Sequence, residues 1–139
     1  MMTGNASGYR FQTLDNANDV TFNQLLGINN EDVIAGYFGS GAQDHPNKGY
    51  LLLPPYSQEN NQNENFPGSM QTQVTGLNDL GVTVGFWSSM NNPSQVNDNF
   101  AFYRLRNGTV GNASFPTGDA ASPPVDQLLG VSDSDVAVG

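Results

Sequence analysis

The pattern of apolar and polar residues repeats three times along this chain. Residues 24–38, 73–87 and 127–139 each begin with Gln, carry Gly three residues later, and carry a second Gly nine residues beyond the first. In each copy a polar cluster separates two short apolar runs, which predicts two β-strands joined by a turn. A period of about fifty residues is typical of repeat architectures.

The second copy shows the turn most clearly. Its segment Asn78-Asp79-Leu80-Gly81 predicts a type I turn with Gly81 at positive φ, the common three-residue hairpin with a bulge. Gly36 and Gly85 fall inside strands, where glycine is unfavourable unless another group packs close to it. Their recurrence predicts the same close approach in each repeat.

Other segments complete the units. Residues 9–14 alternate aromatic and polar side chains, which predicts a half-buried strand. The polar tract 58–65 is predicted to be a mobile loop, and residues 1–8 a flexible leader. Strands are predicted at 24–29, 33–38, 49–53, 100–105 and 109–110.

These strands predict an all-β chain of propeller-like, four-stranded antiparallel repeats. Roughly four short strands per fifty residues are typical of a propeller blade, although a β-sandwich is the alternative. We expect one domain at 9–139, with units at about 24–72 and 73–126 and a partial unit formed by 127–139 with 9–23.

About two and a half units are fewer than the four blades of the smallest propellers, so either the sequence is a piece of a longer protein or copies of it assemble, and we expect completion by another chain. The strand at 9–14 would then complete a neighbour's blade. A homo-oligomer results if the copies close into a ring, and a filament if they do not.

The charge and composition of the chain limit the kinds of partner that it can bind. The net charge is −9 with four Lys and Arg in 139 residues, which disfavours nucleic acid and anionic membranes. No cysteine is present, so disulfides and thiolate metal sites are excluded. The low charged fraction, 12%, and the abundance of Asn, Gly and Ser favour an extracellular protein, and the first eight residues lack the charged and apolar regions of a signal peptide.

Four aromatic residues are the candidates for ligand binding. Aromatic rings can stack on sugars, although aromatics at recurring strand positions also form sheet cores. Neighbours on a strand face opposite ways, so one of each adjacent pair at 37–38 and 86–87 should be exposed. The candidates are Trp87, Tyr37, Tyr50 and Tyr103.

Acidic residues offer a candidate calcium site. Asp133 and Asp135 present hard oxygen ligands, although their spacing does not match an EF-hand. Turn positions also favour Asp for local backbone bonding. His45 is the only histidine and lies in a polar loop, so a zinc site or a Ser-His-Asp triad is disfavoured.

The repeats resemble a bacterial extracellular family, the HAF-type repeat. Gly27-Ile28-Asn29-Asn30 and Gly76-Leu77-Asn78-Asp79 match its first element, and 11–15 match its closing element. Lys48 and Asn99 stand where the family has His. The resemblance implies secretion and a propeller-like fold, and it implies no catalytic residues.

We therefore expect a non-enzymatic extracellular β-repeat protein that serves as a binding or assembly scaffold, with a glycan or a protein as ligand. One alternative is a self-assembling structural protein of a filament or surface layer. Another is a secreted carbohydrate-active hydrolase with an intersubunit site. Catalysis usually breaks repeat symmetry at one place, and no repeat carries an unmatched carboxylate pair.

Overall fold

The computed structural model describes residues 8–91, 97–116 and 121–139, which form antiparallel sheets and one short 3-10 turn, η1 (Gln58–Asn60). None of these residues belongs to a helix long and apolar enough to cross a bilayer. The strands are β1 (Asn23–Ile28), β2 (Ile34–Phe38), β3 (Lys48–Leu52), β4 (Asn61–Asn63), β5 (Gln71–Leu77), β6 (Thr83–Ser88), β7 (Phe100–Arg104), β8 (Val110–Asn112), β9 (Gly130–Val131) and β10 (Ala137–Val138).

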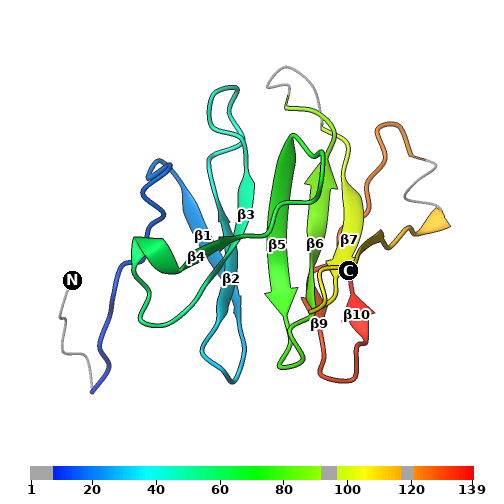
Figure 1. Ribbon diagram of the computed structural model, residues 1–139. Coiled ribbons are helices and arrows are strands. Elements are labelled where there is room, and N and C mark those ends of the chain that lie inside the picture. Colours follow the sequence, from blue (N-terminus) through cyan, green and yellow to red (C-terminus); the bar gives the residue numbers. More distant parts are fainter. Residues whose placement is uncertain (1–7, 92–96, 117–120) are drawn as a thin grey trace.

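The strands form three sheets that follow one another along the chain (Figure 1). Sheet 1 has the order β1-β2-β3-β4, sheet 2 the order β5-β6-β7-β8, and sheet 3 pairs β9 with β10. The predicted all-β class and the four-stranded antiparallel repeats are confirmed. The described residues form no closed barrel or ring.

The recurring turns have the predicted geometry. Gly81 has φ 77°, and Asp32 and Asp135, at the same place in the other hairpins, have φ 60° and 58°. Glycine adopts this left-handed region freely, and Asp tolerates it better than most residues. In the second hairpin, Asn78 Oδ1 also accepts the backbone N–H of Val82 at 2.9 Å, which fixes the turn.

The recurring strand glycines make the predicted close approach. A Cβ built on Gly36 would lie 2.1 Å from the Gln24 carbonyl oxygen, and one on Gly85 would lie 2.0 Å from that of Gln73. The strand register shifts near these pairs, between residues 25 and 27 of β1 and between residues 74 and 76 of β5. This β-bulge explains why the first two copies need a residue without a side chain on the returning strand.

Two local predictions were wrong. Residues 9–14 form no strand because the described chain offers them no partner strand; only Leu14 packs, against the cluster of Ile34, Tyr50 and Leu52. Residues 58–63 are ordered as η1 and β4, because β4 pairs its backbone with β3 whatever its side chains. Most of the predicted leader, residues 1–7, lies outside the described residues.

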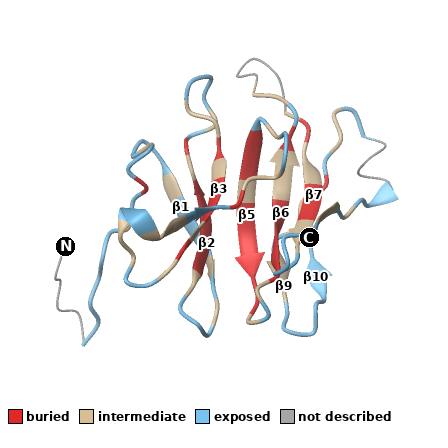
Figure 2. Ribbon diagram, viewed as in Figure 1, coloured by how far each residue is buried: buried red, intermediate tan, exposed pale blue. Residues whose placement is uncertain are grey.

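The core lies mainly between the sheets, as the burial colours show (Figure 2). Ala35 of sheet 1 packs against Val74, Leu77 and Phe102 of sheet 2, and Phe102, Val74 and Ala35 have no exposed surface. Each sheet therefore uses one face to bury the apolar face of the next sheet.

Candidate functional site

Consecutive sheets meet through a row of glycines on their first strands. A Cβ on Gly27 would lie 3.3 Å from the Cα of Gly76, and one on Gly76 would lie 3.1 Å from the Cα of Gly130. These distances are tighter than ordinary side-chain packing, so the backbones of β1, β5 and β9 approach one another closely. The first Gly of each repeat is therefore a contact between sheets.

The three hairpin turns are also joined, at the lower edge of the molecule in Figure 1. Asn29 Nδ2 donates to the Asn78 carbonyl at 3.2 Å, and Asn78 Nδ2 donates to the Ser132 carbonyl at 2.9 Å. The next backbone N–H repeats the pattern: Asn30 donates to Asp79 Oδ1 at 2.7 Å. The backbone N–H of Asp79 donates in the same way to Asp133 Oδ1 at 2.9 Å. We call this arrangement the turn ladder.

Replacing Asn78 with Ala should lower the free energy of unfolding by about 2 kcal/mol, because a buried side chain and its hydrogen bonds to Val82, Ser132 and Asp135 are lost at once. Asn78 is 3% exposed. Its side-chain amide accepts the N–H of Val82 in its own turn and donates to the Ser132 carbonyl and to Asp135 Oδ1. Urea denaturation measures the change. The exposed turn residue Asn107 bonds only Thr109 among the described contacts, so Asn107→Ala is the control. An equal loss in both variants would contradict the ladder.

A buried ionic group adds to the contact between sheets 1 and 2. Glu64, 7% exposed, follows β4 and accepts a hydrogen bond from the Thr83 hydroxyl at 2.6 Å. Arg104 Nε lies 3.0 Å from the same carboxylate oxygen, and its guanidinium donates to the Asn65 carbonyl at 2.8 Å. The group therefore holds sheet 1 against sheet 2 through one buried carboxylate.

The surfaces at the two ends of the stack are exposed. Leu25 and Ile28 of sheet 1 are 41% and 61% exposed, whereas their counterparts in sheet 2, Val74 and Leu77, are 0% and 9% exposed. We call the surface of Leu25 and Ile28 the head face. It is apolar, because Leu25, Leu26, Gly27 and Ile28 line a shallow hollow with Ile34.

Sheet 3 leaves the opposite surface exposed. Val136 and Val138 are 60% and 61% exposed, whereas Val82 and Val84 at the same positions of sheet 2 are 9% and 1% exposed. We call the surface of Val136 and Val138 the tail face. Head and tail are thus the two halves of a contact that the chain makes internally between its own sheets.

Trp87 and Tyr103 are the candidate aromatics that remain partly exposed. Trp87 stacks on Phe66 with ring centroids 4.5 Å apart and an interplanar angle of 3°, and contacts Phe100 at 4.8 Å. Its indole N–H donates to Asn112 Oδ1 at 3.0 Å. The Tyr103 ring covers Gly111 on the neighbouring strand, where a Cβ would lie 2.5 Å from the ring. Both rings are packed against the chain on at least one face.

Tyr37 and Tyr50 belong to the interior. They are 7% and 2% exposed, and the Tyr37 hydroxyl donates to Gln24 Oε1 at 2.6 Å. Burial raises the pKa of both phenols. The structure therefore does not gather the four candidate aromatics into one site, and neither buried ring presents a free face to a ligand.

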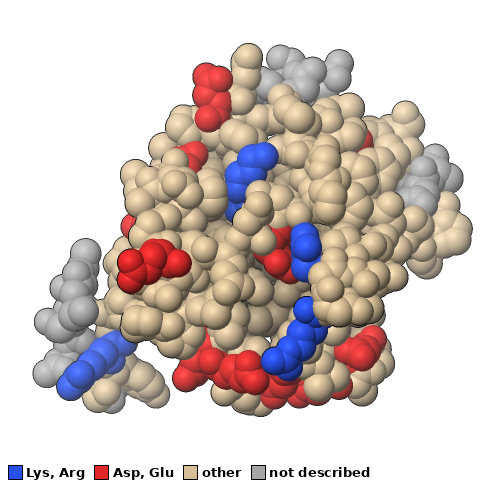
Figure 3. Space-filling model, viewed as in Figure 1, with Lys and Arg blue, Asp and Glu red and all other residues tan. Residues whose placement is uncertain are grey.

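Asp133 and Asp135 use their carboxylates in the turn ladder. Asp133 Oδ1 accepts the Asp79 N–H, and Asp135 Oδ1 accepts Asn78 Nδ2 at 3.0 Å. Acidic side chains gather along the lower edge of the molecule (Figure 3). Within the described residues, no three His, Cys, Asp or Glu side chains are grouped as metal ligands. Calcium binding here stays a prediction.

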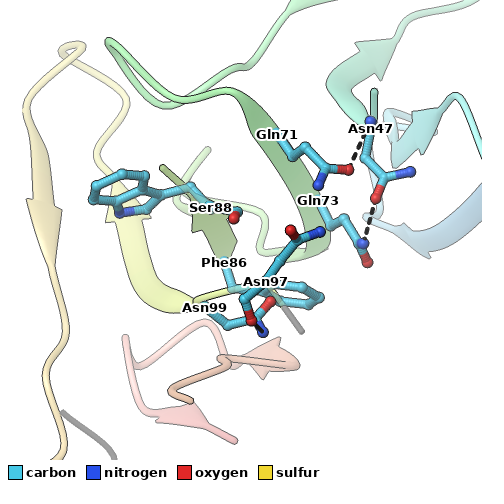
Figure 4. A pocket seen from close by; sticks show the side chains of 8 residues that line it. Asn47, Gln71, Gln73, Phe86, Ser88, Asn97 and Asn99 are labelled. Carbon is cyan, nitrogen blue, oxygen red and sulfur yellow. Dashed lines mark hydrogen bonds between the residues drawn. The ribbon is translucent and has the colours of Figure 1, made fainter. Parts of the chain in front are cut away.

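A polar pocket that the sequence did not indicate lies between sheets 1 and 2 (Figure 4). Gln73 Nε2 donates to Asn47 Oδ1 at 2.8 Å, and Gln71 Oε1 accepts the Asn47 N–H at 3.2 Å. The cavity holds about 50 Å³, room for a water molecule and not for a sugar ring. The amides therefore serve to hold the loop before β3 against β5.

His45 holds the segment before β1. Its Nδ1 lies 2.6 Å from Asp19 Oδ2, and the Thr21 hydroxyl and N–H donate to Asp19 Oδ1 at 2.5 and 3.0 Å. The Thr21 hydroxyl bond and then the His45 bond lower the pKa of Asp19 from 3.8 to about 2. Stability from this carboxylate is therefore present above pH 3.8 and is lost as the pH falls towards 2.

Replacing Thr21 with Val should raise the pKa of Asp19 towards 3.8, because the largest cause of its lowering is removed. An NMR titration of the Asp19 side-chain carboxyl carbon measures the shift. Asp44, in the same loop as His45, serves as an internal reference. An unchanged pKa for Asp19 would contradict the role given to Thr21.

No family model, curated protein or solved structure matches the chain.

Proposed function

We propose that the protein is a non-enzymatic extracellular scaffold of propeller-like β-repeats, whose copies associate head to tail through the contact that already joins its own sheets. One observation carries this proposal. The positions exposed on the head and tail faces are buried in sheet 2, the sheet that has a neighbouring sheet on both sides. Matched apolar surfaces of this kind are typical of protein–protein contacts.

The complementarity extends to the backbone and the turns. In a head-to-tail pair, Gly130 of one copy would meet Gly27 of the next, as Gly76 meets Gly130 within the chain. The Asp133 N–H would donate to Asn30 Oδ1, continuing the turn ladder. Each of these contacts has an internal precedent, so the association needs no new type of interaction.

A contact between different faces is heterologous, and it generates a ring if the rotation closes and a filament if it does not. A closed ring of copies would be a propeller-like assembly. An open filament would be a self-assembling structural protein. The low charged fraction of 12% and the resemblance to HAF-type repeats support an extracellular setting. The use of Asp133 and Asp135 in turn contacts supports a role without catalysis.

Blocking one face at a time tests the head-to-tail contact. Ile28→Lys should block the head and Val138→Lys the tail, because each places a charge in an apolar contact. Each variant alone should be monomeric by light scattering, whereas an equimolar mixture should form pairs through the intact head of one and the intact tail of the other.

Leu80→Lys is the control for added charge. Leu80 is 50% exposed but lies in the second hairpin turn, away from both faces, so this variant should associate as the unchanged protein does. The proposal fails if Leu80→Lys abolishes association as well. It also fails if the mixture of Ile28→Lys and Val138→Lys remains monomeric while the unchanged protein associates.

A further inference from the structure

An apolar cavity of about 420 Å³ lies beside sheet 3, against the face of sheet 2 that β9 and β10 cover in part. Ala101, Ala113 and Phe115 of the second repeat line one side, and Leu128 and Gly139 line the other. Phe115 is 66% exposed although it belongs to the wall of a cavity. A cavity of this size and composition has room for an aromatic side chain.

Sheets 1 and 2 show which group fills the corresponding place. Tyr50 on β3 lies opposite Gly36, and Phe102 on β7 lies opposite Gly85. Both aromatic side chains are buried, at 2% and 0% exposure. Gly139 is the third member of this glycine series, and a Cβ on it would lie 1.8 Å from the Gln127 carbonyl oxygen, as in the other two copies.

The wall of the cavity follows the same precedent. Phe102 meets the edge of the Phe66 ring with centroids 5.7 Å apart, and Phe66 precedes Pro67 just as Phe115 precedes Pro116. An aromatic residue opposite Gly139 would therefore meet Phe115 as Phe102 meets Phe66. Such a residue needs a strand beside β10, which in the described part of the chain pairs only with β9.

We propose that Tyr9 of a second copy occupies this cavity, and that residues 8–12 of that copy pair with β10 as an added strand. The inference rests on the proposed head-to-tail association and names the segment that completes it. In both complete sheets a small residue precedes the buried aromatic, as Gly49-Tyr50 and Ala101-Phe102, and Gly8-Tyr9 repeats this pair. A strand added to an exposed sheet edge is a common mode of protein recognition.

The register follows from β3, where Leu51 and Leu52 lie opposite Ala35 and Ile34. Tyr9 opposite Gly139 then places Arg10 opposite Val138 and Phe11 opposite Ala137. Tyr9 and Phe11 share a strand face, because side chains alternate along a strand, and both would be directed towards sheet 2 of the receiving copy. Within their own chain they are 69% and 58% exposed, so the added strand gives them a site of burial.

Residues 8–12, the arm, are anchored close to the head face, from which they can reach β10 of a second copy. Leu14 packs against Ile34, Tyr50 and Leu52 of its own sheet 1, and Ile34 also lines the hollow of the head face. When the tail of a second copy stacks on that head, residues 8–12 lie next to its β10. Ser114 and Gln127 line the same cavity and offer polar partners for the Tyr9 hydroxyl.

Disulfide trapping tests the pairing directly, because the chain has no cysteine of its own. Arg10→Cys protein is mixed with Val138→Cys protein, oxidised mildly and analysed on a non-reducing gel. Residues directly opposite on antiparallel strands are close enough for a disulfide, so a cross-linked heterodimer should accumulate. Mixing Arg10→Cys with Val136→Cys is the matched control, since Val136 is as exposed as Val138 but two residues out of register.

Association of the arm variants supplies the second measurement. Tyr9→Ser should weaken association by about tenfold or more, whereas Tyr9→Phe should retain it, because the ring provides most of the burial. If the unchanged protein is monomeric by light scattering, the proposed function fails together with the inference. If it associates but Val138 and Val136 cross-link equally, or Tyr9→Ser associates normally, only the inference is overturned.

Discussion

Replacing Gly85 with Ala should lower the free energy of unfolding by about 3 kcal/mol, because a new side-chain atom would overlap backbone atoms that cannot move aside. The added Cβ would lie 2.0 Å from the Gln73 carbonyl oxygen and 3.1 Å from the Phe102 ring. Relief requires the bulged strand β5, the first strand of sheet 2, to separate from β6. Equilibrium denaturation in urea, followed by Trp87 fluorescence, measures the loss.

Gly130→Ala is the matched control. It replaces a glycine of the same motif, but its Cβ would meet only the Val138 side chain at 3.7 Å, an ordinary contact. Its backbone does not need positive φ, so Ala brings no conformational strain. In a monomer, where Gly130 meets no other copy, the change should stay within about 0.5 kcal/mol of zero. Tolerance of Ala at Gly85 would show that the two glycines of the motif are not constrained differently.

Replacing Phe102 with Ala should cost about 4 kcal/mol, the largest loss expected for a single side chain in this protein. Phe102 has no exposed surface, and it belongs to the cluster of Ala35, Val74 and Leu77 that joins sheets 1 and 2. Its removal leaves a cavity between two sheets whose backbones are already in contact, so the walls cannot collapse to fill it. The same urea titration measures the loss.

Two further variants test whether the loss of stability in Phe102→Ala comes from lost buried packing. Phe102→Leu keeps much of the buried volume and should cost less than half as much as Phe102→Ala. Phe115→Ala removes the same type of side chain at 66% exposure and should be nearly neutral in a monomer. Equal losses for Phe102→Ala and Phe115→Ala would contradict the assignment of the core to the surface between sheets.

The repeat pattern predicted most of the sheet structure because it reports backbone constraints. Gly36 and Gly85 were recognised as close approaches from their recurrence alone, and the carbonyl oxygens of Gln24 and Gln73 are the groups they approach. Gly81 at positive φ follows equally from local turn chemistry. Features that depend on a few neighbouring residues are thus visible in a single sequence.

Features that depend on distant partners were missed or misplaced. Residues 9–14 have the alternation of a strand, but a strand needs a neighbour, and their own chain supplies none in the described part. The polar residues 61–63 lack that alternation, yet they pair with β3 as an edge strand. Of the amide contacts that Asn47 makes with Gln71 and Gln73, only the one with Gln73 has a sequence signal, because Gln73 begins the second copy.

The candidate site shows the same division. Single-sequence reasoning singled out Trp87, Tyr37, Tyr50 and Tyr103 as aromatics at recurring positions, but recurrence cannot say which ring faces solvent; Tyr37 and Tyr50 are buried. The head and tail faces could be recognised only by comparing exposure at equivalent positions, such as Ile28 with Leu77. That comparison needs the stacking of sheets, which sequence spacing does not give.

The absolute mass in solution, measured by light scattering behind a sizing column over a range of concentrations, tests the head-to-tail account most directly. The account predicts particles of two or more chains of 14.9 kDa, with a discrete mass for a ring and a broad, concentration-dependent mass for a filament. A folded monomer at every concentration would contradict it, because the head and tail faces would then remain exposed without a partner.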